Sequence, residues 1–597
     1  MTDEPDDLLT TEPAAAEPAK AKKAHHSVVY VHGIGSQRRY EETSRVVDRL
    51  DQYARTSVLK QFGSLVGIRA RVEPRNRDPK ANEIGYINVV HSGAGGRRVV
   101  RFYEAYWAPV MADVTSAKDV LKWLFTQPSR PWKTLLAPWR ERQRLRRSSL
   151  VALFEASLRK PTLYEDDDFR DLLKDYYEFE GMDAQRDHAE GSFSEFLAFV
   201  GGRHKDAVKR GRMRALAETW RATYRGEELR NMVALTTMAL GLVLVFAGLV
   251  LVILNVLELG AGLSPVAALL EKTGTEFTPT IGTALAMVIF LAGAFNLSRA
   301  LTDYLGDVQA WATYEETDAK HVARRKALDE CMAVLTHVLR DETCERVTVV
   351  AHSLGTSIAH DALLALERRN QARRPIAPEE CVDLTKIRYF VTMGSPIDKI
   401  EYFFESYASR SHRYKRVVEA LRGDISHSPF TVRGKPYIHW INFWDDGDPI
   451  SGALHSPAGA EVNIQRVDNV HVASLWFPAP GGSHSGYFDH RTVIAGLFRI
   501  IFLRPPDFAD AKSVADYQDI FLPEGDPTGG RAVFLRLAGA VPWLALAGAL
   551  AWGVAWLFDI PSMRPVGMAA GGLALAIAVF LGVAYRVSRH KGQRTPI

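Results

Sequence analysis

The 597-residue sequence contains few cysteines, and their positions argue against two kinds of stabilising site. The three present, Cys331, Cys344 and Cys381, lack metal-ligand spacing and cannot all pair with one another. Free structural thiols in a reducing compartment are the favoured interpretation. The histidines show no HxxxH pattern and there is no paired-carboxylate arrangement, so neither a metal nor a cofactor is predicted.

The sequence also lacks a strong charge of either sign. A formal net charge of +4 is too small for a chain of this length to indicate nucleic acid binding. Residues 1–26 are rich in Asp, Glu, Pro, Ala and Lys and lack the apolar stretch of a signal peptide. We interpret them as a disordered tail.

Four long segments have no charged residue, and they hold much of the apolar excess. As a helix with a rise of about 1.5 Å per residue, the first segment, residues 232–257, would be longer than the ~30 Å hydrocarbon core of a bilayer. Buried core helices can also be apolar all round, but four such segments favour two transmembrane hairpins. Basic residues flank both hairpins, so the positive-inside rule places both termini in the cytoplasm. The segments are residues 232–257, 280–297, 537–558 and 566–585.

Residues 119–147 interleave Trp, Leu and Phe with a dense run of arginine. Such a segment is typical of a helix in the interface of an anionic membrane. A basic, solvated helix with its aromatic side chains in a protein core is an equally good interpretation.

The strongest local motif is Ala351-His352-Ser353-Leu354-Gly355. A short β-branched run precedes it at residues 347–350, and apolar residues at helical spacing follow it. Strand, sharp turn and helix form the context of a GxSxG nucleophile elbow, in which Ser353 is the nucleophile. Ala351 replaces the first glycine but keeps that position small.

An apolar strand and a glycine-rich turn lie at residues 28–36, Val-Val-Tyr-Val-His-Gly-Ile-Gly-Ser. A turn of this kind can supply one backbone N–H to an oxyanion hole, and the residue after the nucleophile supplies the other. We predict that the N–H groups of Ile34 and Leu354 have these roles. No GxxxxGK[ST] follows, so a phosphate-binding loop is a weak alternative.

The VHGIG turn and the AHSLG elbow together resemble the α/β-hydrolase superfamily, specifically its bacterial lipase and esterase branches, some of which carry AxSxG. The resemblance covers about residues 27–107 and 303–505. It implies the chain order nucleophile, acid, histidine.

That order directs the search for the acid to residues after Ser353. Asp448 is favoured because it follows a predicted strand at residues 437–444 and precedes a proline. Asp445 and Asp398 are the alternatives.

The histidine is expected in a loop after the next strand, near residues 463–472. His484 lies in a glycine- and serine-rich loop before an apolar helix at residues 493–501, and His471 and His490 are alternatives. His484 would take the proton of Ser353, and Asp448 would orient its imidazole.

The predicted fold is an α/β-hydrolase sheet with a large insertion, plus four transmembrane helices in two hairpins. A helix at residues 303–340 is expected to lead back to the nucleophile strand. The predicted divisions are a tail (1–26), the first part of the core (27–110), the insertion (111–302), the second part of the core (303–505), a linker (506–531) and a C-terminal hairpin with a basic tail (532–597).

The predicted function is a serine hydrolase of carboxylic esters, anchored in a bacterial inner membrane with its hydrolase domain in the cytoplasm. Its partners would be the lipid bilayer and a lipid or other acyl ester, and no nucleic acid. Thioester and amide hydrolysis remain open, as does a non-catalytic membrane scaffold that keeps the hydrolase fold. The sequence does not indicate an oligomeric state.

Overall fold

An eight-stranded mixed sheet organises the computed structural model, which describes most of residues 24–126, 166–229, 306–404 and 429–503, with short gaps in each range. The strand order is β2-β3-β4-β1-β5-β6-β7-β8. The β2, β3 and β4 strands pair antiparallel, and all pairs from β4 to β8 are parallel. The strands are β1 (His25–Val31), β2 (Ser64–Pro74), β3 (Glu83–Gly93), β4 (Gly96–Ala105), β5 (Cys344–His352), β6 (Ile387–Met393), β7 (His439–Trp444) and β8 (Asp468–His471).

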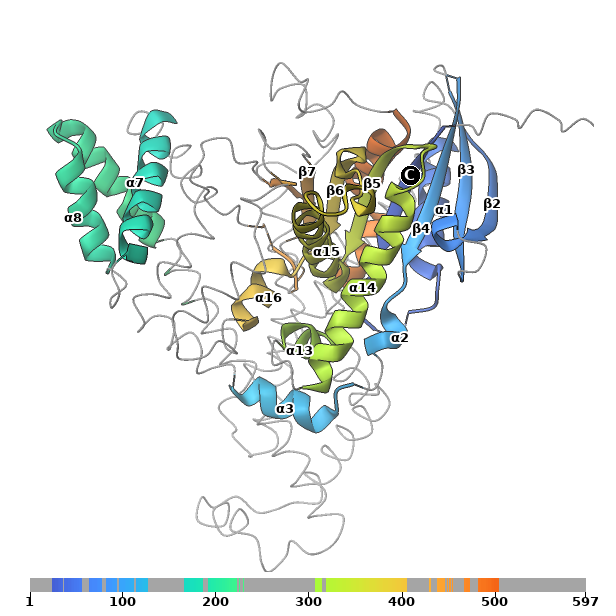
Figure 1. The fold of residues 1–597 in the computed structure, drawn as a ribbon, viewed down its shortest axis with the longest axis horizontal. Coiled ribbons are helices and arrows are strands. Elements are labelled where there is room, and N and C mark those ends of the chain that lie inside the picture. The colour runs from blue at the N-terminus through green and yellow to red at the C-terminus, as the bar shows by residue number, and fades with distance from the viewer. Residues whose placement is uncertain are drawn as a thin grey trace, which may run out of the picture.

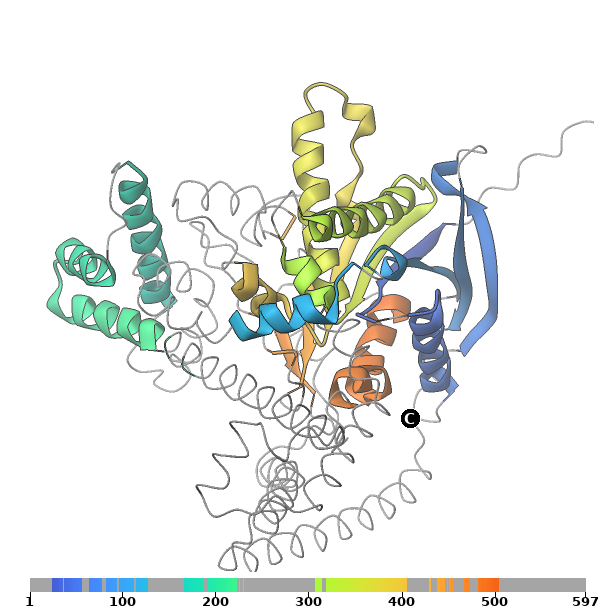
Figure 2. The same ribbon diagram turned by 90° about the horizontal axis from the view of Figure 1, so that it is seen from below.

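Helices cover both faces of this sheet (Figures 1 and 2). Successive strand residues point to opposite faces, so Val29 and Val349 pack with α14 and α15, whereas Val28 and Val350 pack with α1 and α19. The result is a three-layered α/β/α core. The helices are α1 (Glu41–Arg55), α2 (Ala108–Met111), α3 (Ala117–Thr126), α7 (Asp166–Gln185), α8 (Phe193–Arg203), α13 (Asp307–Ala312), α14 (Ala319–Leu339), α15 (Leu354–Arg373), α16 (Ile397–Phe404), α18 (Gly482–Ser485) and α19 (Arg491–Phe498), with a 3-10 turn η6 (Gly486–Asp489) and a π-helical turn η7 (Arg499–Leu503).

The predicted membrane helices require a correction of the fold class. No helix among the described residues is long and apolar enough to cross a membrane. The longest of them, α14, carries six Lys, Arg, Asp or Glu residues, which the hydrocarbon core disfavours. The predicted segments 232–257, 280–297, 537–558 and 566–585 lie outside the described residues. The prediction of a hydrolase sheet with four transmembrane helices was therefore wrong, and the fold described is a mixed α/β sheet with helices.

The start of the core also differs from the predicted boundary. Because β1 begins at His25, the core includes two residues assigned to the tail. The buried His26 explains this: its imidazole is 3.0 Å from the hydroxyl of Thr348 on β5 and 3.0 Å from the carbonyl oxygen of Ile501. These contacts tie the first strand to its neighbour and to the helical layer.

Several predicted elements differ in their bounds. The helix expected at residues 303–340 is two helices, α13 and α14, because Thr313, directly after α13, has an extended backbone. The strands expected at 437–444 and 463–472 are β7 and the short β8. Of the segment 119–147, the structure describes only the part that belongs to α3, where Val120 and Trp123 are buried.

Part of the predicted insertion has a hydrophobic core of its own. Tyr176 of α7, Phe196 of α8 and Trp220 of a third helical stretch are buried together. Their rings lie 5.2–5.5 Å apart at steep angles, a favourable aromatic arrangement. Ser192 begins α8 with a reciprocal capping box to Glu195.

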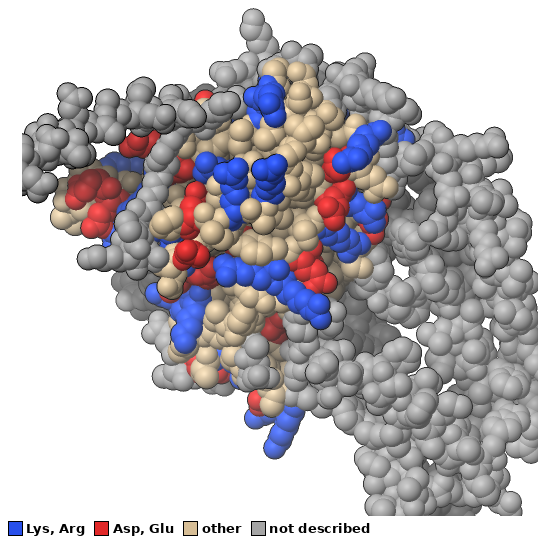
Figure 3. Space-filling view, turned by 90° about the vertical axis from the view of Figure 1, so that its right-hand side faces the viewer, with Lys and Arg blue, Asp and Glu red and all other residues tan. Residues whose placement is uncertain are grey.

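The edge strand β2 is largely exposed. Val72 is 66% exposed, and Arg69 and Arg71 are exposed beside it. The corresponding side of the molecule shows basic and acidic side chains interspersed among other residues (Figure 3). Charged side chains on an edge strand oppose pairing with another chain.

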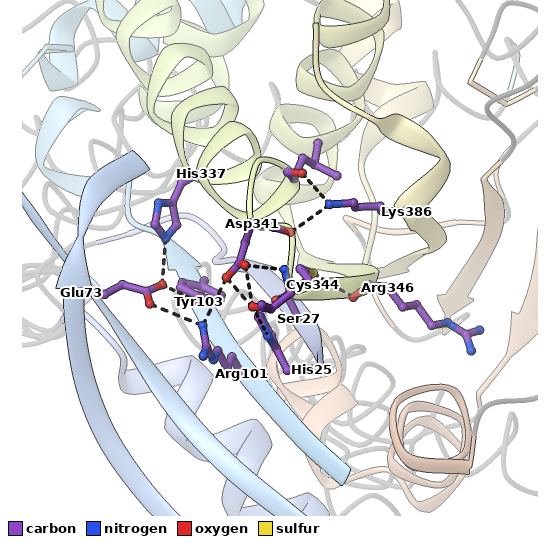
Figure 4. A network of polar contacts seen from close by, with 12 residues as sticks. His25, Ser27, Glu73, Arg101, Tyr103, His337, Asp341, Cys344, Arg346 and Lys386 are labelled. Atoms are coloured by element: carbon purple, nitrogen blue, oxygen red, sulfur yellow. Dashed lines mark hydrogen bonds and ion pairs between the residues drawn. The ribbon is translucent and has the colours of Figure 1, made fainter. Parts of the chain in front are cut away.

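A polar network joins β2, β4 and α14 at the end of the sheet where β5 begins (Figure 4). Glu73 of β2 accepts hydrogen bonds from Tyr103 (2.7 Å) and His337 (2.9 Å). Arg101 lies 3.4 Å from the carboxylates of both Glu73 and Asp341. At ~3.3 Å per residue, the length of β5 separates this network from Ser353 by roughly 25 Å.

Candidate active site

Ser353 occupies a sharp turn between β5 and α15. Its φ of 53° and ψ of −132° are unusual for a residue with a side chain, and such strain costs about 1–3 kcal/mol. Two hydrogen bonds hold the turn: the N–H of Ser353 donates to Met393 O (3.0 Å), and the hydroxyl of Thr356 donates to Ser353 O (2.6 Å). This is the strand–turn–helix geometry of a nucleophile elbow.

The small residues of the elbow are explained by close backbone contacts. A Cβ atom on Gly355 would lie 2.2 Å from the carbonyl oxygen of His32, which is too close for any side chain. A Cβ atom on Gly33 would lie 3.0 Å from the Cβ of Ser353. Residues 32–35, here called the oxyanion turn after the role predicted for Ile34, therefore lie directly against the elbow. The structure brings the segments of Ile34 and Leu354 together.

Three predicted residues form a hydrogen-bonded chain. The Ser353 hydroxyl lies 2.7 Å from Nε2 of His484, and Nδ1 of His484 lies 2.8 Å from Oδ2 of Asp448. An ionised carboxylate can only accept, so Nδ1 carries the proton and Nε2 accepts from the serine. All three side chains are buried.

The alternatives for acid and base occupy other positions. Nδ1 of His484 has a single N–H to donate, and Asp448 receives it rather than Asp445 or Asp398. Asp445 is buried next to Asp448 and accepts the N–H of that residue through its backbone carbonyl (3.1 Å), while Asp398 lies in the first turn of α16. His471 ends β8 and His490 caps α19.

The electrostatics keep the acid ionised and the base neutral. Burial alone would raise the pKa of Asp448, but hydrogen bonds from His484, the N–H of Ile450 and Tyr487 hold it well below its usual range. For His484, burial lowers the pKa because it disfavours the imidazolium; Asp448 partly opposes this, and the nearby His352 lowers it further. A neutral imidazole beside Ser353 is the form that can accept a proton.

Tyr487 is a site residue that the sequence did not reveal. Its hydroxyl donates to Oδ2 of Asp448 (2.9 Å) and lies 2.8 Å from the hydroxyl of Ser451. Its ring and that of His484 lie against Gly394, whose φ is +61° and where a Cβ would be 2.9 Å from the Tyr487 ring. The only feature of the sequence that could have indicated Tyr487 was its position three residues after His484.

Glu42 and His352 were also missed as site residues. Glu42, in the first turn of α1, lies 3.5 Å from Nδ1 of His352. His352 stands inside the AHSLG motif, but nothing in the motif indicates a partner more than 300 residues away. Only the tertiary structure brings these two side chains together.

Hydrogen bonds within the oxyanion turn, and to Trp107 and Asp307 outside it, fix the position of the turn. The Nε2 of His32 accepts the N–H of Trp107 (3.1 Å), so its Nδ1 donates to Gly33 O (2.8 Å). Burial lowers the pKa of His32 to about 4, which keeps it neutral. The N–H of Gly35 donates to the Asp307 carboxylate (3.2 Å). The turn is thus positioned before any substrate arrives.

No group of three or more His, Cys, Asp or Glu side chains in the described part of the chain is arranged to hold a metal ion. Comparisons with protein-family models, curated proteins and solved structures found no match to this chain.

Proposed function

We propose that this chain is a serine hydrolase of the α/β-hydrolase type that cleaves acyl esters through an acyl-enzyme. The observation that carries the proposal is the 2.7 Å hydrogen bond between Ser353 and His484 in a strained elbow. A serine activated by a histidine, which a carboxylate orients, is the arrangement that nucleophilic acyl transfer requires.

In the first half-reaction, His484 takes the proton from Ser353 as Oγ attacks the ester carbonyl carbon. The N–H groups of Ile34 and Leu354 are the donors proposed for the resulting oxyanion. When the C–O bond breaks, His484 returns the proton to the leaving alcohol. Water then attacks the acyl-enzyme with His484 again as base, which releases the acid and restores Ser353. Asp448 stays ionised throughout and stabilises the imidazolium.

The substrate we propose is an acyl ester of any kind, because the expectation of a lipid depended on the predicted transmembrane helices. An ester, thioester and amide of the same acyl chain would distinguish the reaction classes. We expect the ester to be hydrolysed with the highest kcat/KM. A higher kcat/KM for the thioester or the amide would overturn the assignment to esters.

Labelling with a fluorophosphonate probe tests the nucleophile, since the probe phosphonylates activated serines. The wild-type chain should label, and Ser353→Ala should abolish labelling. Ser194→Ala, which removes an exposed serine of α8, is the matched control and should label like the wild type. Absence of labelling in the folded wild-type chain, or labelling that persists in Ser353→Ala, would refute the proposal.

A further inference from the structure

A second carboxylate is inserted among the elements that form the site. Oε2 of Glu42 accepts hydrogen bonds from the hydroxyl of Tyr30 on β1 (2.8 Å) and from the N–H of Gly33 (3.3 Å). Its Oε1 accepts from the side-chain amide of Gln37 (3.2 Å), which also donates to Ile34 O (3.4 Å). One side chain of α1 therefore connects the central strand with both sides of the oxyanion turn.

The same carboxylate reaches the nucleophile elbow through His352. Nδ1 of His352 lies 3.5 Å from Oε1 of Glu42, an ion-pair distance. On the other side of the ring, Nε2 donates to the backbone carbonyl of His484 (2.9 Å). The rings of His352 and His484 are 5.0 Å apart. Two histidine–carboxylate pairs, Glu42–His352 and Asp448–His484, thus lie side by side.

The pKa shifts of Glu42 and His352 both favour the charged forms of the second pair. Burial alone would raise the pKa of Glu42, but His352 and the hydroxyl of Tyr30 lower it to about 2. Burial alone would lower the pKa of His352, yet Glu42 and the carbonyl of His484 raise it. The titratable groups around His352 are Glu42 of α1, His32 of the oxyanion turn, Asp448 after β7, His484 of α18 and Tyr487 of η6.

We propose that Glu42 and His352 are a positioning pair that fixes the oxyanion turn, the nucleophile elbow and the loop of His484 in place relative to one another. The inference rests on the proposed hydrolase function. Neither residue reacts with the substrate. Glu42 positions the turn that carries Ile34. His352, which precedes Ser353 in the elbow, contacts Glu42 through Nδ1 and the backbone of the catalytic histidine through Nε2, so it fixes the elbow and that histidine relative to the turn.

The first test replaces Glu42 with glutamine, which keeps its size and removes its charge. Because the oxyanion forms only in the transition state, the loss should fall on kcat and leave KM nearly unchanged. We expect a fall of about 10- to 100-fold, as for displacement of a catalytic group by around 1 Å. Glu41→Gln, which alters the exposed neighbour in the same helical turn, is the matched control.

A double-mutant cycle tests whether the two residues act as a unit. If Glu42 works through His352, the variant Glu42→Gln/His352→Gln should be no slower than the slower single variant. If the loss of activity in the double variant equals the product of the losses in the two single variants, the residues act independently and the positioning pair is contradicted. Thermal unfolding of each variant separates these effects from loss of the fold.

The pH profile gives a readout that a purely structural role would not move. His352→Gln removes a positive charge beside His484 and leaves the negative Glu42 nearby, so the acidic limb of kcat/KM should shift to higher pH. Glu42→Gln removes the negative charge, which lowers the pKa of His484. It also removes the partner that keeps His352 charged, which raises the pKa of His484. Because these effects oppose each other, the acidic limb of Glu42→Gln should move less than that of His352→Gln.

The outcomes distinguish the pair from the hydrolase itself. A wild-type chain that fails to label with the fluorophosphonate contradicts the hydrolase proposal. If the wild type labels but Glu42→Gln labels at the same rate with its kcat unchanged, and His352→Gln leaves the acidic limb in place, the hydrolase remains supported and the positioning pair is refuted.

Discussion

The hydroxyl of Tyr487 donates a 2.9 Å hydrogen bond to the same oxygen of Asp448 that accepts the N–H of His484. The carboxylate is therefore fixed from two directions. The N–H of Ile450 donates to its other oxygen (2.9 Å), which leaves Asp448 little freedom to rotate away from the imidazole.

Tyr487→Phe should consequently weaken the orientation of His484 while leaving the ring packing intact. We expect kcat/KM to fall by about 5-fold, which corresponds to roughly 1 kcal/mol of transition-state stabilisation. Ser451→Ala, which keeps the bond between Tyr487 and Asp448, should cost less than about 2-fold. Steady-state kinetics on one ester give kcat/KM for both variants. An equal loss of kcat/KM in Tyr487→Phe and Ser451→Ala would argue against the role given to Tyr487.

Gly355→Ala should disrupt the elbow because the added Cβ would lie 2.2 Å from the backbone oxygen of His32. We expect a destabilisation of about 2 kcal/mol or more and a loss of fluorophosphonate labelling. At Gly202, near the end of α8, nothing lies within 4 Å of an added Cβ. Gly202→Ala should therefore be neutral, or stabilising by up to about 1 kcal/mol. Normal labelling of Gly355→Ala would show that the strand and helix are not held this closely.

Glu104 should make stability depend on pH. Burial raises the pKa of this carboxyl to about 7, although the N–H of Tyr40 and the hydroxyl of Thr43 donate to it. The folded chain thus keeps a proton that the unfolded chain releases near pH 4.5. Its contribution is fully present below about pH 4.5 and is lost as pH rises through about 7.

The test compares Glu104→Gln with the wild type by urea unfolding at about pH 5 and pH 8. The wild type should lose stability relative to the variant between these values, by up to roughly 3 kcal/mol. Identical pH dependences would indicate that Glu104 does not hold the proton.

Glu73→Gln should affect stability without affecting the active site. It weakens hydrogen bonds from Tyr103 and His337 at the opposite end of β5 (Figure 4), and we expect a loss of about 1–3 kcal/mol. The labelling rate of Ser353 should stay unchanged. Glu83→Gln, at an exposed position on the neighbouring β3, is the control and should change stability by less than about 0.5 kcal/mol. A slower labelling rate in Glu73→Gln would connect the network to the site.

Hydropathy by itself limits what a long apolar segment can indicate. A hydrophobic run indicates that a segment avoids water, but it does not distinguish a bilayer from a protein interior. The apolar patterns of β1 and β5, by contrast, predicted strands that the structure contains, because each is short and bounded by a turn.

The sequence by itself determined the local features of the site. Residues 347–355 specify strand and turn through β-branched residues followed by small ones, and the chain order placed Asp448 and His484 downstream. These features depend on neighbours along the chain, so their pattern can be read without the fold.

Only the tertiary structure decided which side chains meet. It selected Asp448 over Asp445, and it brought Tyr487, Glu42 and His352 into contact with the site. Their roles come from hydrogen bonds and charges between distant segments, and the burial that gives those interactions their strength exists only when the sheet and its helices have assembled.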